Sequence, residues 1–469
     1  MDGLECSEIL LSQVQQYEPF RIDSHFYEKQ YRELKKTLSK FSCSPLKSLV
    51  SKAIQTGHTP SMAVDSYYGG DIALIKTDNL HDDSIGTVFS DYLTSEGNEV
   101  ISRTQLAAGD IITTIIGATE QIIARSAIVT EEYLPANINQ NIVQIRIDPH
   151  KAAPEYVNAY LNSKYGKRYL YYLSRQTEQF NLNCKEVEIV QIPMLSEVFQ
   201  KEIVKAVQGA QRQQSKSRAV YKNAEILISV FLNIHIAEQA KPVFSVKRIS
   251  DSFLKTGRLD AEYYQKKYEA IIRDLSTADS VQTLCNIHDE TFFPANGRSY
   301  NYIELANVGR CGDVSGIDSL ECGDLPSRAR RRVSAGQVII SSVEGSLQSC
   351  ALIEDEFDGA LCSTGFFVLD SDVINSETLL VLFKSEPIQA LLKQRCSGTI
   401  LTAISKDELL SMPLPTIDQD VQIAVAEKVR ESFALRRQSK ELLEYAKQAV
   451  ELAIEQGEDV ALQWLKERV

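Results

Sequence analysis

The chain has 469 residues and a formal net charge of −13, with 43% hydrophobic and 24% charged residues. This composition is typical of a globular protein that is long enough for two or three domains. No stretch approaches the roughly 18 to 20 apolar residues that a membrane span needs, and the first residues lack a basic segment followed by an apolar run. We therefore expect a cytoplasmic protein that does not span a membrane.

Charge and cysteine usage narrow the possible functions. Nine cysteines are scattered singly, with no Cys-x-x-Cys pair and no histidine at ligand spacing. Neither a zinc site nor a disulfide framework is expected, and most thiols should be reduced and structural. The acidic balance weakens the case for nucleic acid, because phosphate binding depends on clustered Lys and Arg. Such binding needs only a local patch, however, and residues 328–332 contain four arginines.

A short element near the N-terminus occurs twice. The stretch Arg21-Ile-Asp-Ser-His-Phe-Tyr returns as Arg258-Leu-Asp-Ala-Glu-Tyr-Tyr, at a separation of 237 residues (258 minus 21). In each copy the aspartate can cap a short helix whose aromatic residues face inward. A repeat of this length indicates a duplicated domain, since the period of a solenoid is about 20 to 50 residues.

Short β-branched runs follow each copy and are bounded by Gly, Asp and Asn, as in the strands of a compact sheet or half-barrel. A helical segment comes next, near 153–173 and 376–393, followed by a polar loop and a proline, Pro193 or Pro415. The predicted strands lie at 71–76, 109–117, 126–130 and 141–147 in the first half and at 302–307, 336–342, 350–353 and 365–369 in the second.

Two long helices are predicted by heptad spacing of apolar and small residues, from 200 to about 237 and from 422 to about 454. They align without a gap at a separation of 222 residues (422 minus 200). Polar residues such as Ser217 and Ser439 make each helix too polar to be buried on all sides, so the two are expected to pair as an antiparallel coiled coil. Two unrelated surface helices are the simpler alternative.

The sequence therefore predicts an α+β fold with two pseudo-repeated globular domains and a coiled-coil spacer. The predicted domains are 1–194 and 242–415, followed by long helices at 195–241 and 416–469. A helix of about 35 residues is roughly 50 Å long, which corresponds to between one and two turns of DNA. Adding one heptad at the repeat-matched points after Ser217 and Ser439 is expected to move the domains apart by roughly 10 Å.

This twice-repeated order resembles the specificity subunits of type I restriction-modification systems, over nearly the whole length. The resemblance is carried by the Arg-x-Asp-x-x-aromatic-Tyr openings, the paired helices and the prolines before them. It also includes Ala-Gly-Asp-Ile-Ile and Ala-Gly-Gln-Val-Ile, and the stretches 137–141 and 363–366. It implies two target recognition domains that read a bipartite, asymmetric site in double-stranded DNA. It also implies two docked copies of an adenine-N6 methyltransferase subunit, with restriction and translocase subunits as further possible partners.

The resemblance implies no catalysis by this chain, with S-adenosylmethionine and ATP expected only on partner subunits. The residues agree with that expectation, because we find no glycine-rich turn or Walker spacing for a cofactor. The sequence also lacks Asn-Pro-Pro-Tyr and Asp-Pro-Pro-Tyr, which an adenine methyltransferase would carry. A rival hypothesis is a non-catalytic coiled-coil scaffold or an acidic DNA mimic, which the net charge favours. A mimic, however, would carry carboxylates where this chain has its arginine run.

Candidate DNA-binding residues are Arg, Lys, Asn, Gln and Thr side chains in the two globular domains, because these groups contact bases and phosphates. The amide-rich loop 176–181 and the arginine run are the strongest candidates, and a solvated surface is the alternative for both. The DNA-binding candidates are Lys76, Asn79, Arg103, Thr119, Gln121, Arg125, Gln176, Thr177, Gln179, Asn181, Arg298, Asn307, Arg328, Arg330, Arg331, Arg332, Thr399 and Thr402. The partner-binding candidates are Arg21, Asp23, Tyr27, Arg258, Asp260 and Tyr264.

Overall fold

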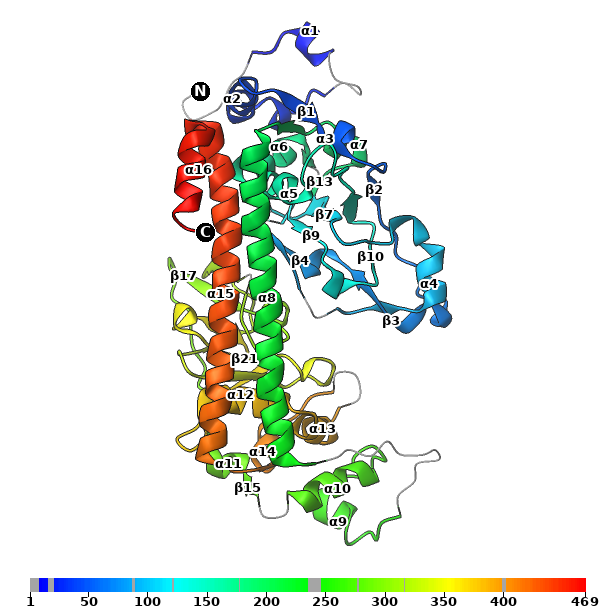
Figure 1. Ribbon diagram of the computed structural model, residues 1–469. Helices are drawn as coiled ribbons and strands as arrows, with labels where there is room; N and C mark the ends of the chain where they lie inside the picture. Colours follow the sequence, from blue (N-terminus) through cyan, green and yellow to red (C-terminus); the bar gives the residue numbers. More distant parts are fainter. Residues whose placement is uncertain are drawn as a thin grey trace. The chain divides into compact units, whose positions relative to one another are not determined.

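The computed structural model describes residues 8–15, 21–86, 89–119, 122–176, 178–234, 246–275, 278–315, 317–398 and 402–469. The chain forms two compact units (Figure 1). Unit 1 consists of Met1–Gln213 and Arg437–Val469, and unit 2 consists of Gln214–Arg436. Each unit has its own α+β body and includes half of each long helix, which confirms the predicted fold class. No helix in the described ranges is long and apolar enough to cross a membrane.

Unit 1 is built on a four-stranded antiparallel sheet in the order β2-β11-β7-β9. A second sheet, β10-β3-β6, contains the parallel pair β10 and β3. The helices outside the long pair are α1 (Leu11–Val14), α2 (Lys29–Leu38), α3 (Leu46–Leu49), α4 (Ser95–Val100), α5 (Pro154–Asn162), α6 (Lys164–Leu173), α7 (Cys184–Glu188) and α16 (Glu458–Lys466). The strands are β1 (Cys43–Pro45), β2 (Gln55–Thr56), β3 (Tyr68–Ile75), β4 (Leu80–His81), β5 (Ser84–Ile85), β6 (Tyr92–Leu93), β7 (Ile111–Thr114), β8 (Ile116–Gly117), β9 (Ser126–Ile128), β10 (Ala136–Ile138), β11 (Ile142–Ile145), β12 (Arg175–Gln176), β13 (Phe180–Asn181) and β14 (Gln191–Pro193).

Unit 2 repeats this plan, with an antiparallel sheet in the order β16-β23-β20-β21. Its second sheet, β18-β17-β22-β19, again contains one parallel pair, β17 and β22. Its helices outside the long pair are α9 (Phe253–Thr256), α10 (Lys266–Asp274), α11 (Val281–Leu284), α12 (Ser376–Lys384), α13 (Glu386–Arg395) and α14 (Lys406–Leu410). Its strands are β15 (Asp279–Ser280), β16 (Asn286–Ile287), β17 (Ser299–Ile303), β18 (Asp318–Glu321), β19 (Ala329–Arg332), β20 (Val338–Ser341), β21 (Cys350–Leu352), β22 (Leu361–Ser363), β23 (Phe366–Asp370) and β24 (Pro413–Leu414).

The central strands form where the sequence has its densest β-branched runs. All four residues of β7 and all four of β20 are buried, as expected for strands covered on both faces. In unit 1 the core cluster includes α5, α6 and the apolar residues of the long helices, with Tyr156 and Tyr160 fully buried. In unit 2 a corresponding cluster joins α12 and α13 to the other halves of those helices. Each half of the helix pair therefore belongs to the core of one unit.

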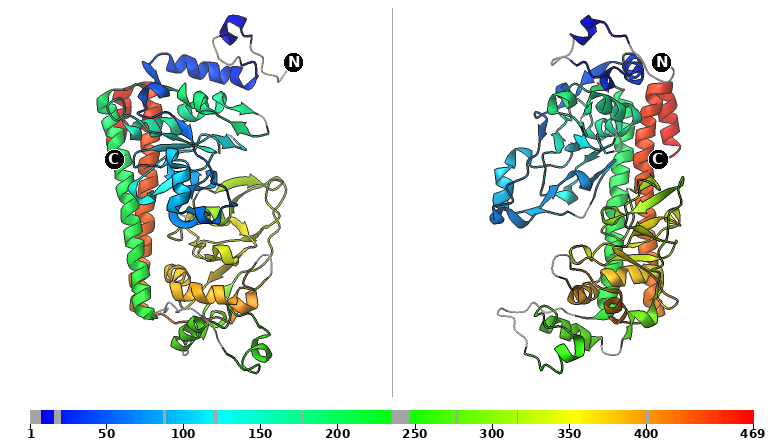
Figure 2. Two further views of the ribbon diagram at one scale, coloured as in Figure 1. Left: turned by 90° about the vertical axis from the view of Figure 1, so that its right-hand side faces the viewer. Right: turned by 180° about the vertical axis from the view of Figure 1, so that it is seen from behind.

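The long helices α8 (Glu197–Leu232) and α15 (Gln419–Gln456) pair antiparallel, as predicted, and lie side by side in Figure 2. In unit 2 the Ser217 and Ser432 hydroxyls are 2.9 Å apart, and each also donates to the other residue's carbonyl oxygen at 2.8 Å. In unit 1 the Ser439 hydroxyl donates to the Ala210 carbonyl oxygen at 2.8 Å. Ala210 is seven residues before Ser217, and Ser439 seven residues after Ser432, so one register connects both contacts.

The same glutamine fixes the beginning of each long helix. In unit 1 the Gln200 amide donates to the Leu195 carbonyl oxygen at 3.0 Å and accepts from the Ala153 amide at 3.3 Å. In unit 2 Gln422 makes the matching bonds, to the Ile417 carbonyl oxygen at 2.9 Å and from the Asn375 amide at 2.8 Å. All three matched positions differ by 222 residues, so the repeat read from the helices extends into each body.

The second long helix covers the heptad segment predicted from 422 to about 454, within the longer spacer segment 416–469. It ends at Gln456, because Gly457 has a positive φ of 95° that residues with a side chain rarely adopt. The chain then forms α16, which packs back against the long helix, with the Trp464 and Tyr445 rings edge to face at 5.7 Å. The predicted end of the first helix, beyond Ile234, lies outside the described residues.

Candidate nucleic-acid interface

Three of the four arginines of the run lie in β19, an edge strand of its sheet, and Arg328 directly precedes it. Its pairing with β22 is shifted by an irregularity between Ala329 and Arg331, which leaves Arg330 without a partner residue in the register. The Arg330 and Arg332 guanidinium groups lie 5.7 Å from the ring centres of Phe293 and Phe292, respectively. Arg331 instead donates to the Phe366 carbonyl oxygen and lies over the Phe367 ring. The run is therefore divided between an aromatic loop and the body of the sheet.

The aromatic loop, residues 288–298, follows the free edge of β19. The Phe292 amide donates to the Arg330 carbonyl oxygen at 2.7 Å, and the Phe292 ring meets Tyr300 edge to face at 5.8 Å. Phe292 packs against a small buried cluster, whereas Phe293 is 75% exposed. The side chains of this surface, which we call the arginine–phenylalanine surface, are those of Phe292, Phe293, Tyr300, Arg330 and Arg332. The sequence interpretation omitted Phe292 and Phe293, although Thr-Phe-Phe-Pro at 291–294 lies only a few residues before the candidate Arg298.

The other DNA-binding candidates of unit 2 differ in exposure and in the hydrogen bonds that their side chains make within the chain. Arg298 and Arg328 are exposed. Asn307 is buried, accepts from the Glu304 amide at 2.8 Å and donates to the Ser315 carbonyl oxygen at 3.1 Å. It therefore stabilises a turn, which explains its position better than base contact does. The Thr402 hydroxyl donates to the Glu344 carboxylate, and Thr399 lies outside the described residues.

Asn79 in unit 1 has the same role as Asn307. It is buried, and its side-chain oxygen accepts from the Lys76 amide at 3.0 Å. The Lys76 ammonium is paired with the Asp91 carboxylate, so it is partly neutralised. Arg125 is half-buried and donates to the Leu80 carbonyl oxygen at 3.4 Å. These three candidates hold local structure in the free chain.

The amide-rich loop is placed on a three-stranded sheet of order β12-β13-β8. Gln176 pairs with Phe180, and Asn181 pairs with Ile116, so the loop is held against the end of β8. Thr119 follows β8 and is exposed, as are Gln176, Gln179 and Asn181. Gln176 and Asn181 therefore lie on one small sheet, with Thr119 and Gln179 in the segments next to its strands, a proximity that the sequence did not predict. Thr177 and Gln121 lie outside the described residues.

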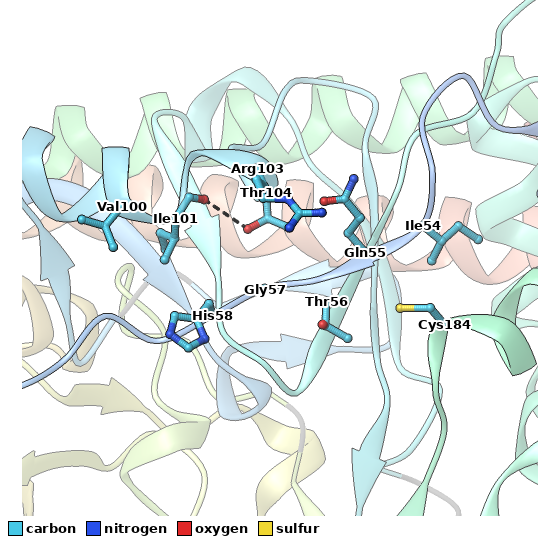
Figure 3. Close-up of a pocket in the computed structure, with 10 residues that line it drawn as sticks. All are labelled: Ile54, Gln55, Thr56, Gly57, His58, Val100, Ile101, Arg103, Thr104 and Cys184. Atoms are coloured by element: carbon cyan, nitrogen blue, oxygen red, sulfur yellow. Dashed lines mark hydrogen bonds between the residues drawn. The ribbon is translucent and has the colours of Figure 1, made fainter.

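Arg103 lies apart from that sheet and lines a pocket of about 450 Å³ (Figure 3). The Lys52 ammonium donates to the Arg103 carbonyl oxygen at 2.5 Å and to the Gln144 side-chain oxygen at 3.1 Å. The pocket wall is mixed, with polar groups from Arg103, His58 and Thr104 facing apolar ones. Its lining residues are Ile54, Gln55, Thr56, Gly57, His58, Val100, Ile101, Arg103, Thr104 and Cys184.

The partner-binding candidates of unit 1 form an internal clamp. The Arg21 guanidinium donates to both carboxylate oxygens of Asp23 at 2.9 Å. It also donates to the carbonyl oxygens of Leu173 and Ser174 at the end of α6, where helix carbonyls lack partners of their own. The Tyr27 hydroxyl donates to the Arg21 carbonyl oxygen at 2.8 Å. Burial raises the pKa of Asp23, but the hydrogen bonds and charge of Arg21 leave that pKa lowered overall.

Unit 2 repeats the clamp at the end of α13. Arg258 donates to Asp260 at 2.7 and 2.8 Å and to the Arg395 and Cys396 carbonyl oxygens at 3.3 and 2.8 Å. The Tyr264 hydroxyl donates to the Arg258 carbonyl oxygen at 3.0 Å. The Arg258 hydrogen bond lowers the pKa of Asp260 despite its partial burial. Because these groups bind one another, the clamp is a structural element of each unit.

Each clamp holds a large aliphatic side chain in solvent. Ile22, between Arg21 and Asp23, is 86% exposed, and Leu259, between Arg258 and Asp260, is 73% exposed. The two positions correspond in the repeat. Single exposed apolar residues are ordinary, but a rigid element that presents one at the same place in both units is not explained by folding alone.

Within the described ranges, no group of three or more His, Cys, Asp or Glu side chains is placed to hold a metal ion. Eight cysteines are described, and all are free thiols. Burial raises the pKa of Cys285 and Cys362 to about 12, so these two thiols are protonated and unreactive near neutral pH.

No protein-family model matches the chain. Among solved structures, the chain is similar to the type I restriction-modification S subunit from M. genitalium, with 12% identity, coverage of 91% of this chain and 96% of that chain, and a TM-score of 0.33. It is also similar to the HsdS subunit from Thermoanaerobacter tengcongensis, with 16% identity, coverage of 89% and 97%, and a TM-score of 0.30. A third match, from a study of complex assembly and conformational transition in a type I R-M system, has 15% identity, coverage of 92% and 98%, and a TM-score of 0.29.

Proposed function

We propose that this chain is the DNA-specificity subunit of a multisubunit adenine-N6 methyltransferase, reads a bipartite and asymmetric site in double-stranded DNA, and performs no catalysis itself. The observation that carries the proposal is its duplication. Two α+β bodies of matching strand topology each share a core with half of one antiparallel helix pair. Such a molecule is suited to present two recognition surfaces and two equivalent docking surfaces.

The two bodies differ where DNA contact is proposed, which supports an asymmetric target. Unit 1 presents exposed amide and hydroxyl side chains around β12 and β13, and unit 2 presents arginines and aromatic rings along β19. Amides suit adenine edges, while arginines suit guanine edges and phosphates. A DNA mimic would instead carry carboxylates along β19.

The shared clamps support docking of one methyltransferase copy to each unit. We propose Ile22 and Leu259 as the contact residues, with the predicted set Arg21, Asp23, Tyr27, Arg258, Asp260 and Tyr264 holding them in place. In this proposal S-adenosylmethionine and ATP bind only to partner subunits, among which restriction and translocase subunits are included.

Coexpression with the methyltransferase subunit from the same host, followed by sequencing of methylated adenines, tests the function. We expect methylation at a site with two defined parts and an undefined gap, only when this chain is present. Exchanging residues 21–194 for those of another such subunit should change one half of the site and leave the other. Methyl transfer from labelled S-adenosylmethionine by the purified chain alone, or methylation that is independent of the chain, would contradict the proposal.

A further inference from the structure

We propose that Phe293 inserts its ring at a base-pair step of the half-site that unit 2 reads, while Arg330 and Arg332 hold the neighbouring phosphates. This inference rests on the proposed function and adds a distortion of the DNA to it. Apolar side chains that enter the base stack kink the duplex, and stacking on an aromatic ring is tolerant of sequence.

The first argument is the contrast between two adjacent rings. Phe292 is half-buried, packs against Tyr300 and belongs to a buried cluster with Tyr302, Ala329 and Leu361. Phe293, the next residue, is 75% exposed. One ring thus anchors the loop, and the other is left in solvent. The exposed face of the Phe293 ring keeps apolar area in water that contact with a partner would bury.

The second argument is that the loop is held at several points. The Phe292 amide is bonded to β19, and the Ala295 amide donates to the Tyr300 hydroxyl at 3.0 Å. Before the ring, His288 is bonded to Asp370 at 2.6 Å, and Asp289 is paired with Lys406 at 2.5 Å. Pro294 fixes φ directly after Phe293. A ring on such a loop loses little conformational freedom on binding, which favours affinity.

The third argument is charge, and it identifies DNA as the occupant. The Arg330 guanidinium lies over the Phe293 ring, and Arg332 lies over the adjacent Phe292 ring. Arg298 and Arg328, from the ends of the same two segments, are exposed. Arginine beside aromatic rings is the combination that binds phosphates and unstacked bases together. A protein partner of this surface would have to be strongly acidic.

The test uses the assembled complex and duplexes that contain the mapped site, with 2-aminopurine placed in turn at each position of the half-site assigned to unit 2. We expect binding to raise 2-aminopurine fluorescence at one step. Phe293→Ala should abolish this rise and weaken binding about 5- to 150-fold, the range for loss of one aromatic stack. Phe293→Trp should retain both properties.

Val373→Ala, which removes another exposed apolar side chain of unit 2, should leave binding and fluorescence unchanged. Because Phe293 is exposed, the thermal midpoint of Phe293→Ala should equal that of the wild type. If the wild-type complex binds its site but Phe293→Ala binds equally well, or if no step changes fluorescence, the insertion is wrong and the specificity function stands. If the wild-type complex has no site preference, both proposals fall.

Discussion

Asp83 combines a positive φ in a tight turn with a raised pKa of its side chain. It occupies the two-residue connection between β4 and β5 with a φ of 58°, a conformation that Asp and Asn tolerate better than most residues. Its carboxylate accepts from the side-chain amides of Asn158 at 2.9 Å and Asn162 at 2.6 Å. Burial raises its pKa to about 7, although the charge of Lys447 opposes this shift. The turn is thus bound to α5 by a carboxyl group that resists ionisation.

We expect Asp83→Asn to stabilise unit 1 above neutral pH. Between the ordinary pKa of 3.8 and about 7, the folded state holds a proton that the unfolded state has lost, so wild-type stability falls as pH rises through this window. Asparagine keeps the acceptor oxygen and has no charge to bury. The loss of stability between pH 5 and pH 8, measured by thermal unfolding at both values, should therefore be smaller in the variant by about 2 to 3 kcal/mol.

Asp71→Asn, on the exposed start of β3, controls for the general effect of removing one negative charge. It should shift the midpoints at both pH values by the same small amount. An Asp83→Asn variant with the wild-type pH dependence would show that this carboxyl is ionised in the folded state.

Arg330 and Arg332 lie over the rings of the aromatic loop, whereas Arg331 is bonded within the sheet, so we expect their substitutions to have different effects. Arg330→Ala with Arg332→Ala should weaken DNA binding and lower the slope of log affinity against log salt by about two, because each lost phosphate contact removes about 0.9. Arg331→Ala should instead lower thermal stability, since its guanidinium is bonded within the sheet. Binding titrations of the complex from 50 to 200 mM salt measure the slope. Arg273→Ala, at a 77% exposed side chain on α10, should leave it unchanged.

Sequence reasoning named candidate segments but could not tell which of their side chains are bonded within the fold. Asn79 and Asn307 have the chemistry of base readers, but both stabilise the same turn in the two units. The residue type alone does not show whether a side-chain amide would contact a groove of DNA or bonds to the backbone of its own chain. Their repetition was the available signal, because a residue kept by both copies of a duplicated unit serves what the two copies share. Phe293 has no counterpart in the repeat and was overlooked for its apolar character.

The helix pair was predictable because its spacing is a local property of the sequence. Heptad positions gave the two helices, and polar positions such as Ser217 and Ser439 indicated that each helix needs a partner. The register was not predictable, because it depends on which small residues meet across the pair: Ser217 with Ser432, and Ser439 with Ala210. The end of α15 at Gln456 agrees with the predicted end at about 454, because the heptad pattern stops close to Gly457.

The clamps give a prediction for assembly. Ile22→Asp or Leu259→Asp alone should yield complexes with one methyltransferase copy, and the double variant should yield the free chain, because a carboxylate in an apolar contact loses its hydration without a partner. Mass photometry of the coexpressed proteins counts the copies. The exposed positions predict unchanged thermal midpoints. Met62→Asp, at an exposed position outside the clamps, should retain two copies, and two copies in the double variant would exclude this surface.

The two units share their internal supports and differ in their outer side chains. Clamp, helix-start glutamine and turn asparagine recur at matched positions, whereas the amide sheet of unit 1 and the arginine strand of unit 2 do not. In the proposed function, the shared supports serve the attachment of two identical partners, and the different outer side chains serve the reading of two different half-sites. In this proposal the helix pair determines the distance between half-sites and has no part in reading them.

That role can be tested by lengthening both helices, and the register corrects where to do so. Ser217 and Ser439 are matched in the repeat but do not face each other, so heptads inserted after them would slide the outer halves of the pair by seven residues. The residue numbers of both serine contacts have the same sum, 649 (217 plus 432, and 210 plus 439), and the numbers of Gln213 and Arg436 also add up to 649. Insertion after Arg212 and after Arg436 therefore places the two new heptads side by side. It also keeps Arg436 with Asp313 and Glu354, its ion-pair partners at 3.0 and 3.2 Å in unit 2.

The lengthened chain should methylate the same two half-sites at a wider gap. Seven residues add about 10 Å to a helix and nearly complete two turns, so each unit keeps its orientation about the helix axis. At roughly 3.4 Å per base pair, the gap should increase by about three base pairs. Insertion in α8 alone, which breaks the register, should abolish site-specific methylation. Sequencing of methylated adenines distinguishes these outcomes, and an unchanged gap with unchanged half-sites would show that something other than the helices sets the spacing.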